Sequence, residues 1–138
     1  SEDEIERLQA YGQENGVVVM VLSGLSSEAM RAIMRNSVAI VGLAHGEAFG
    51  LTPIEAMALG TPPIFVNEGG YRETVVDGEN GRLIKRGDFA SWKAALDQAQ
   101  EQDTRAIWAE AGLARIEELG LTPIRHAQRL VDKLLPLL

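Results

Sequence analysis

The sequence predicts an α/β fold in which helices cover both faces of a mostly parallel sheet of about four strands, giving three layers. Hydrophobic residues make up 46% of the 138 residues and aromatic residues only 5%, which is typical of a core built from Val, Ile, Leu and Ala. Short apolar runs alternate with amphipathic helical patterns, as they do when parallel strands are joined by crossover helices. We therefore expect one domain over residues 1–138, without an internal repeat or interdomain linker.

The composition excludes several functional classes. The formal net charge of −7 disfavours nucleic acid as a partner, because nucleic-acid binding is driven by Lys and Arg against phosphate. The absence of cysteine excludes disulfides and thiolate metal sites and is compatible with the cytoplasm, where we expect the protein to act. No apolar run approaches the roughly 18 residues that a membrane span needs. Because the chain begins with Ser1 rather than Met, we expect it to be processed or cut.

The first part of the chain predicts a helix, a strand and a second helix. Residues 2–15 have the apolar spacing and the acidic first turn of an amphipathic helix. Residues 17–22 are a continuous Val-rich run, which predicts a central parallel strand buried on both faces. The turn at Gly24 and Leu25 then leads into a helix with a serine N-cap.

The middle of the chain carries the most informative stretch, residues 45–62, which predicts a glycine-rich loop followed by a short helix. Thr52 is placed to N-cap this helix, with Pro53 at its first position. Glu55 stands three residues after the cap, as a capping box requires. Gly60 fits a left-handed C-cap, so the predicted helix is short.

An anion site is expected where this loop enters the helix. The backbone amides of about residues 50–54 are the unpaired donors of a helix N-terminus, and the loop glycines let a ligand approach closely. Glu47 and Glu55 bracket these amides, and carboxylates accept strong hydrogen bonds from hydroxyls. The loop also leaves the carboxyl end of a strand predicted at 38–41, where ligands of open α/β sheets bind. A phosphate flanked by hydroxyls, as in a sugar nucleotide, is the ligand that fits.

A structural explanation of the same residues stays open at this point. Glu55 could be only the reciprocal half of a capping box with Thr52, an interaction of about 1 kcal/mol. Glu47 could be only a solvated loop acid. His45 is more readily a loop or sugar contact than an acid–base or metal group, because the only other histidine is His126.

The rest of the chain predicts the remaining strands and covering helices. The strand, turn and helix signals fall at these places: strands at 64–66 and 82–84, a helical turn at 71–76, a helix capped by Asp88 with Phe89, Trp92, Leu96 and Ala99 on its core face, helix after Thr104 with breaks near Gly112 and at Leu119-Gly120, and a last amphipathic helix from Thr122-Pro123. The apolar face of that last helix offers a surface for a homodimer.

Two stretches of the chain resemble the nucleotide-sugar half of the retaining glycosyltransferases of family 4, which have the GT-B fold. They are EAFGLTPIEAMALGTPPI, with Glu47 and Glu55 separated by seven residues, and EGGYRETVVDGENGRLI. The resemblance covers about residues 17–96 and implies a Rossmann-like C-terminal domain. It implies that the full-length enzyme moves a sugar, with retention, from a nucleoside diphosphate sugar to an alcohol acceptor. A non-catalytic module that binds nucleotides or partners is the alternative.

The resemblance also implies roles for individual residues. Glu47 is the position implied to be catalytic, where it holds hydroxyls of the donor sugar, and Glu55 hydrogen-bonds the ribose. The leaving diphosphate itself assists deprotonation of the acceptor, so no metal, cofactor or nucleophile is implied. For Gly24 and Leu25, where the resemblance implies backbone contacts with the nucleotide base, an ordinary strand-to-helix turn is an equally good explanation. The implied donor-binding residues are Gly24, Leu25, Ala48, Phe49, Gly50, Leu51, Thr52 and Glu55.

Some features of the family are absent from this chain. Leu43-Ala44 stands where the family commonly has Pro-Ser, and the loss of that serine could alter donor preference or loop order.

Glu73 resembles an acidic position of the family. Its carboxylate either faces the substrates or stabilises the N-terminus of its own helix. The acceptor-binding N-terminal domain and the first strands of the C-terminal domain, with their diphosphate-binding Arg and Lys, are expected to be missing. We therefore expect weak donor binding and little turnover, with membrane-surface association only through the full-length protein.

Missing strands would leave residues 17–22 without their usual neighbours if the parent sheet follows the strand order 3-2-1-4-5-6. We expect the chain to close this gap by pairing its first two strands directly or by exchanging strands between copies.

Overall fold

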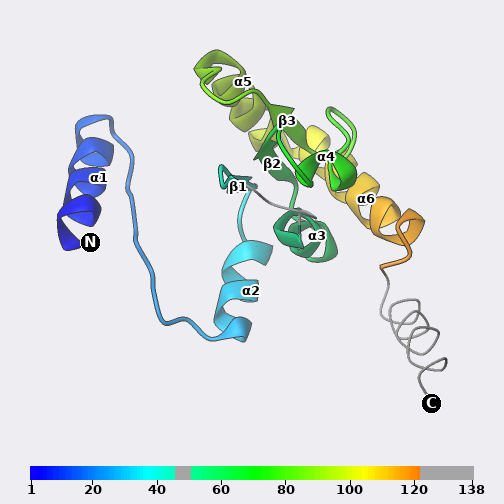
Figure 1. Cartoon of the computed structure of the whole chain (residues 1–138), viewed down its shortest axis with the longest axis horizontal. Helices are drawn as coiled ribbons and strands as arrows, with labels where there is room; N and C mark the ends of the chain where they lie inside the picture. The colour runs from blue at the N-terminus through cyan, green and yellow to red at the C-terminus, as the bar shows by residue number, and fades with distance from the viewer. Residues whose placement is uncertain (46–50, 122–138) are drawn as a thin grey trace. The chain divides into compact units, whose positions relative to one another are not determined.

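The computed structural model describes residues 1–45 and 51–121. The chain divides into two compact units, Ser1–Met30 and Arg31–Leu138. Figure 1 shows the order of the helices and strands. They are α1 (Glu2–Glu14), α2 (Ser27–Arg35), β1 (Ile40–Gly42), α3 (Leu51–Ala58), β2 (Pro63–Val66), α4 (Tyr71–Thr74), β3 (Arg82–Ile84), α5 (Phe89–Gln100) and α6 (Gln102–Glu118).

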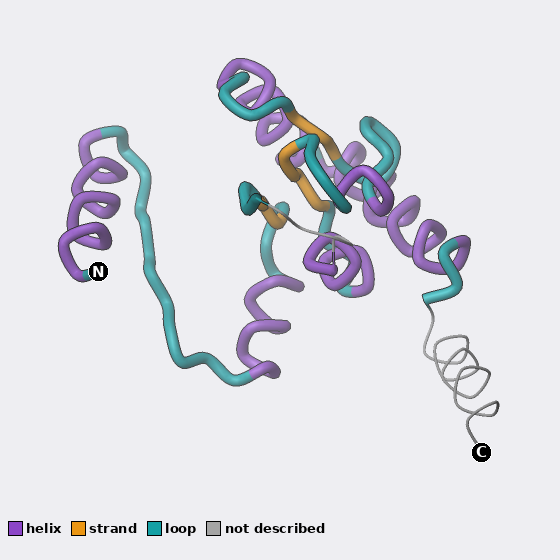
Figure 2. Tube along the Cα trace, viewed as in Figure 1, coloured by secondary structure: helices purple, strands orange, loops and turns teal. Residues whose placement is uncertain are grey.

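A parallel sheet lies at the centre of the second unit, with its strands in the order β1-β2-β3 (Figure 2). Val41 is paired with Ile64, and Ile64 is in turn paired with Arg82. Every residue of β2 is buried, as expected for a parallel strand that lies between two others and is covered on both faces. The predicted α/β fold is confirmed, with three strands in the described part of the chain where about four were expected.

Helices cover both faces of this sheet and complete the three layers. On one face, Ile64 and Ile84 pack with α5 and with Trp108 of α6. Successive residues of a strand point to opposite faces, so Phe65 lies on the other face. There its ring packs against Tyr71 of α4, with the ring centroids 4.7 Å apart. The predicted three-layer α/β/α arrangement is therefore confirmed.

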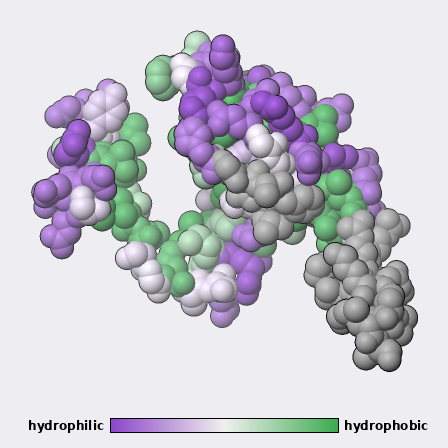
Figure 3. All heavy atoms as spheres, viewed as in Figure 1, coloured by the Kyte–Doolittle hydropathy of each residue, from purple (hydrophilic) through white to green (hydrophobic). Residues whose placement is uncertain are grey.

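The segment after α1 is not the strand that its composition predicts. Residues 17–22 form neither helix nor strand, and Val18 is 87% exposed. The segment turns back along its own helix, where the Val17 amide donates to the Gly12 carbonyl at 2.8 Å and the Val19 side chain covers Gly12. Figure 3 shows its hydrophobic side chains as green spheres beside α1. The prediction of a buried strand is wrong, because no strand among the described residues completes its backbone hydrogen bonds.

The helix α6 is continuous where a break was predicted. Gly112 lies inside it and is buried, because its missing side chain lets α6 approach Met57 of α3 closely. A Cβ at this position would lie 3.1 Å from the Met57 Cγ. The predicted end at Leu119-Gly120 is confirmed, with Gly120 in the left-handed conformation. The helix predicted from Thr122 lies outside the described residues.

The helix α5 begins where its cap was predicted but presents a different face to the core. The Asp88 carboxylate accepts a hydrogen bond of 3.1 Å from the backbone amide of the third helical residue. Ala99 is buried and Trp92 packs against the core, as predicted. Phe89 is 81% exposed and Leu96 is also exposed, so the prediction that they face the core is wrong.

Candidate functional site

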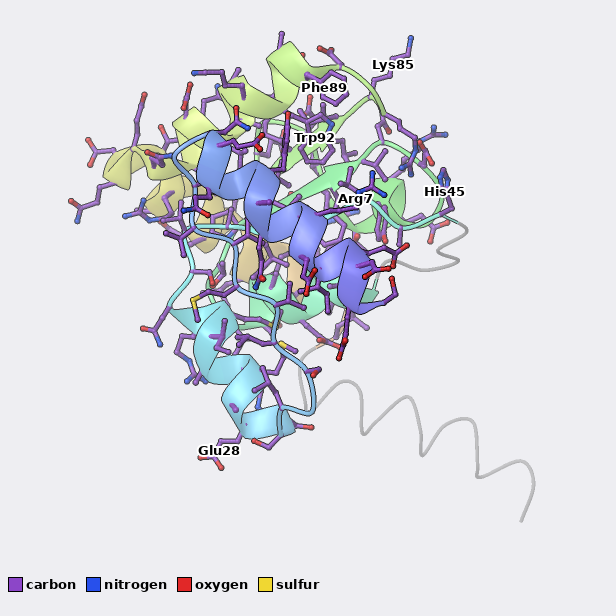
Figure 4. All side chains as sticks on the ribbon, turned by 90° about the vertical axis from the view of Figure 1, so that its left-hand side faces the viewer. Arg7, Glu28, His45, Lys85, Phe89 and Trp92 are labelled. Atoms are coloured by element: carbon purple, nitrogen blue, oxygen red, sulfur yellow. The ribbon has the colours of Figure 1, made fainter. Side chains whose placement is uncertain are left out.

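The carboxyl ends of the three parallel strands meet at one edge of the sheet. The chain leaves β1 at Leu43, β2 at Asn67 and β3 at Lys85. Figure 4 shows His45 and Lys85 on the same side of the molecule. This carboxyl edge therefore gathers polar side chains from stretches that are far apart in the sequence, at the place where open α/β sheets bind ligands.

An ion pair between Glu68 and Arg86 joins the ends of β2 and β3. The Arg86 Nε donates to Glu68 Oε2 at 2.9 Å and its Nη2 donates to Glu68 Oε1 at 3.0 Å, so the pair is bidentate. The two side chains are 34% and 35% exposed. Hydrogen bonds from Arg86 lower the pKa of the Glu68 carboxyl, against the opposing effect of burial, and the same contact raises the pKa of Arg86.

The same pair also reaches the end of β1. The Arg86 Nη2 donates a second hydrogen bond, of 2.9 Å, to the backbone carbonyl of Leu43. The His45 Nδ1 lies 3.3 Å from Glu68 Oε1, although the His45 side chain is 75% exposed. One carboxylate and one guanidinium thus connect the ends of all three strands of the described sheet.

The turn that follows β2 is held by a second arginine. The Arg72 Nε donates to the Asn67 side chain at 2.9 Å, and its Nη2 donates to the Asn67 carbonyl at 2.8 Å. The Asn67 amide in turn donates to the carbonyl of Ile84, the last residue of β3, at 2.8 Å. The turn after β2 therefore has a fixed position relative to β3, and Glu68 is held within it.

The helix α3 begins one residue earlier than its predicted N-cap. Its first residue is Leu51, so Thr52 and Pro53 lie inside the first turn, and the prediction that Thr52 is the N-cap is wrong. Thr52 and Glu55 are both exposed. No residue in the described ranges makes a hydrogen bond or ion pair with the Glu55 carboxylate, so the capping box with Thr52 does not explain that carboxylate.

The rest of α3 is held firmly against the core. At its end, the Gly60 amide donates to the Met57 carbonyl at 3.0 Å and the Thr61 amide donates to the Ala56 carbonyl at 2.9 Å. These are the two bonds of a Schellman motif, with Gly60 in the predicted left-handed conformation. The buried face consists of Pro53, Ala56 and Met57, whereas Ala58 is exposed. The buried face and the Schellman motif together anchor α3 against the core.

The structure brings together part of the predicted donor set. Leu51, Thr52 and Glu55 lie in the first two turns of α3, whereas residues 47–50, including Glu47, lie outside the described residues. Gly24 and Leu25 lie between the 17–22 segment and α2, with Gly24 in the left-handed conformation. The assignment of these residues to a donor remains a prediction.

Glu73 belongs to α4, and its side chain is exposed. Its backbone carbonyl accepts a 2.7 Å hydrogen bond from the Arg115 Nη2 of α6. The choice between a substrate contact and a helix N-terminal role for its carboxylate stays open.

Glu68 and Arg86 were not recognised as site residues from the sequence. Each stands two residues after the last residue of its strand, and Val66 and Ile84 at those strand ends are paired in register. A glutamate and an arginine at equivalent positions after neighbouring strands are therefore the signal that could have identified the pair.

The arrangement combines three features: the first amides of α3, the exposed Glu55 carboxylate, which can accept hydrogen bonds from ligand hydroxyls, and Arg86, which is paired with Glu68. Helix N-terminal amides stabilise an anion, and a carboxylate such as Glu55 accepts hydrogen bonds from sugar hydroxyls. In the part of the chain that the structure describes, no group of His, Asp and Glu residues could hold a metal ion. The same part contains no helix with the length and apolar character needed to cross a membrane.

Comparison with protein families and curated proteins gives a consistent result. The family described as "Glycosyl transferases group 1" matches residues 1–115. The chain is 34% identical over 91 residues to the alpha-1,3/1,6-mannosyltransferase alg-2 of Neurospora crassa, covering 66% of this chain and 19% of the relative. It is 35% identical over 119 residues to sucrose synthase 5 of Arabidopsis thaliana, covering 83% of this chain and 14% of the relative. The chain thus spans less than a fifth of these two relatives.

A solved structure supports the same fold. The C-terminal domain of the glycosyl transferase group 1 family protein LpcC from Francisella tularensis superposes with a TM-score of 0.70 at 24% identity. The superposition covers 84% of this chain and 62% of that domain. At this level of identity the likeness concerns the fold, which is that of a C-terminal domain of this family.

Proposed function

The chain belongs to the group 1 glycosyl transferases, and we propose that it is the part of such an enzyme that binds the nucleoside diphosphate sugar. The parent enzyme then transfers the sugar, with retention, to an alcohol acceptor. In this step the bond from the anomeric carbon to the diphosphate oxygen breaks, and a bond to the acceptor oxygen forms on the same face. The acceptor proton passes to the departing diphosphate, so the step requires no protein nucleophile.

The observation that carries the proposal is the position of the first turn of α3. The helix follows β1 directly in the chain and packs on β1 and β2, so its N-terminus lies at the carboxyl edge of the sheet. Its first amides carry partial positive charge that stabilises a diphosphate, most strongly as negative charge develops on the leaving group. The exposed Glu55 carboxylate stands one turn away, within the same site, as an acceptor for ribose hydroxyls.

The proposal assigns the remaining donor contacts to the residues before α3. Glu47 and the backbone of residues 48–50 hold the sugar hydroxyls, and the amides of Leu51 and Thr52 meet the diphosphate. The proposal includes no metal or cofactor, because the helix N-terminus supplies the charge stabilisation in this segment.

Substitution of Glu55 tests the proposal. Glu55→Gln removes a charged acceptor and keeps the shape, so nucleotide binding should weaken by about 1.5–3 kcal/mol while stability barely changes. Calorimetry with UDP, GDP and ADP and their hexose forms measures the binding, and urea unfolding measures the stability. Glu28→Gln is the matched control, because Glu28 is an exposed glutamate in the first turn of α2.

The two measurements distinguish a binding role from a structural one. Weaker binding of one nucleotide to Glu55→Gln, with the control unchanged, supports the donor site. Reduced stability with unchanged binding would mean that Glu55 serves the helix and not a ligand. Nucleotide binding by a full-length parent that transfers no sugar would favour a non-catalytic binding module.

A further inference from the structure

We infer that Glu68 and Arg86 are positioning residues for the chain where it leaves β1 and enters the donor site. The inference rests on the proposed function for its consequence, which is tighter donor binding. The ordering of the chain after β1 does not depend on the proposed function, because it follows from the hydrogen bond that Arg86 donates to the Leu43 carbonyl. Neither side chain needs to touch the donor for this role.

The first step is that packing does not hold the chain after β1. Leu43, Ala44 and His45 are all exposed. β1 is also an outermost strand of the described sheet, so its far side has no strand neighbour there. An exposed backbone that is not paired must be ordered by specific polar contacts, because fixing each residue costs conformational entropy.

The second step is that Arg86 supplies such a contact. Its guanidinium is planar, so the directions of its N–H groups are fixed relative to one another. Nε and Nη2 donate to the two carboxylate oxygens of Glu68, and Nη2 also donates to the Leu43 carbonyl. Glu68 thereby sets the plane of the guanidinium that meets the carbonyl. A lysine could satisfy one of these acceptors but not the whole fork.

The third step is that Glu68 also lies beside this segment at a second point, where it forms an ion pair with His45 when the imidazole is protonated. The His45 Nδ1 lies 3.3 Å from Glu68 Oε1, two residues after the Leu43 contact. Contacts at residues 43 and 45 restrict the position of the backbone from Leu43 to His45. Misplacement of about 1 Å in a site of this kind is enough to weaken binding and catalysis strongly.

The matched control lies at the other end of the same strand. Arg82 begins β3 and binds the Asp77 carboxylate at 2.7 Å and the Gln98 side chain. Arg82→Met therefore removes an arginine with two side-chain partners from the same strand, away from the carboxyl edge. Arg86→Met and Arg86→Lys are the test variants, and Glu68→Gln is a milder substitution that keeps an acceptor in place.

The experiment measures two properties of the whole chain. Nitrogen-15 relaxation reports the order of the Leu43 to His45 backbone, and calorimetry with UDP, GDP and ADP reports the dissociation constant. In Arg86→Met we expect lower order at Leu43 to His45 and a dissociation constant raised about tenfold, the size of one lost charge-assisted hydrogen bond. Arg86→Lys should recover only part of both, and Arg82→Met should change neither.

The outcomes separate this inference from the proposed function. If Arg86→Met and Glu68→Gln both leave the order of Leu43 to His45 as in the wild type, the inference is wrong whatever the nucleotides do. If order falls but nucleotide affinity is unchanged, the contact does not serve the donor site and the inference is also wrong. If order falls and the wild type binds none of the nucleotides, the positioning contact stands and the proposed function fails.

Discussion

The two ends of β3 use polar groups in different ways. At the amino end, Asn80 is buried and makes hydrogen bonds with the Val76 amide at 2.9 Å and the Thr74 carbonyl at 3.2 Å, and its side-chain nitrogen donates to the Met57 sulfur of α3 at 3.8 Å. At the carboxyl end, Arg86 is half-buried and reaches Leu43, which is 43 residues away in the chain. The comparison teaches that a buried amide side chain ties the turn into β3 to the core, whereas a half-buried arginine joins the ends of β1 and β3 at the site edge.

The largest effect is expected at the amino end. Asn80→Ala should lower the free energy of unfolding by about 2–3 kcal/mol, because it leaves the part-buried Val76 amide and the buried Thr74 carbonyl without this partner. Urea unfolding measures the change, and Glu79→Ala is the control at an exposed neighbouring position. Nucleotide affinity per folded molecule should stay as in the wild type, and a loss of affinity without loss of stability would contradict the division between the two ends.

A smaller stability effect is expected at the carboxyl end of β1. Gly42 is paired with Phe65, and the Phe65 ring occupies the space that a Cβ would need. Gly42→Val should therefore destabilise the fold by about 1–3 kcal/mol through overpacking. The change in urea midpoint checks this value, with Val41→Ala at the exposed preceding residue as the control. An unchanged midpoint in Gly42→Val would show that the ring moves aside at little cost.

The Glu68–Arg86 pair predicts a pH dependence. Hydrogen bonds from Arg86 lower the Glu68 pKa below its ordinary value of 4.5, and His45 acts in the same direction. A lowered folded-state pKa contributes stability that is present above the unfolded-state pKa and is lost as the pH falls through the folded-state value. The carboxyl carbon-13 shift of Glu68 should thus titrate below 4.5 in the wild type and at higher pH in Arg86→Met. Identical titration in the two proteins would mean that the pair does not form in solution.

The smallest effect is expected far from both ends, on the surface of α5. Lys93 and Asp97 form an exposed ion pair of 2.8 Å, in which Asp97 raises the pKa of Lys93. Pairs of this kind are screened by solvent and salt, so Lys93→Met should leave the urea midpoint and nucleotide affinity within error. A clear change in either property would show that exposed charge pairs matter more in this chain than the comparison assumes.

Two apolar runs show why the sequence predicted the sheet only in part. Residues 17–22 and 63–66 are both rich in β-branched or aromatic residues, and both have the length of a strand. Only the second run has strands on both sides, and it is completely buried. Local composition shows that a segment favours the extended conformation. Whether it becomes a strand depends on neighbouring strands that can pair with its backbone.

The candidate site was predictable to a similar extent. The short helix with its Gly60 C-cap and the exposed Glu55 follow from local signals of spacing and turn chemistry. The Glu68–Arg86 pair required the register between β2 and β3, which periodicity alone does not give. The cap predicted at Thr52 was misplaced because a helix can continue one residue ahead of a good capping residue.

The most direct test of the central claim is an amide-shift titration of the chain with UDP, GDP and ADP. The account predicts that one nucleotide shifts the amides of Leu51, Thr52 and Glu55 at the start of α3, while the amides from Asp77 to Arg82 at the amino end of β3 stay unchanged. Saturable shifts that appear only at the amino end, or no shifts with any of the three at millimolar concentration, would contradict a donor site at the carboxyl edge.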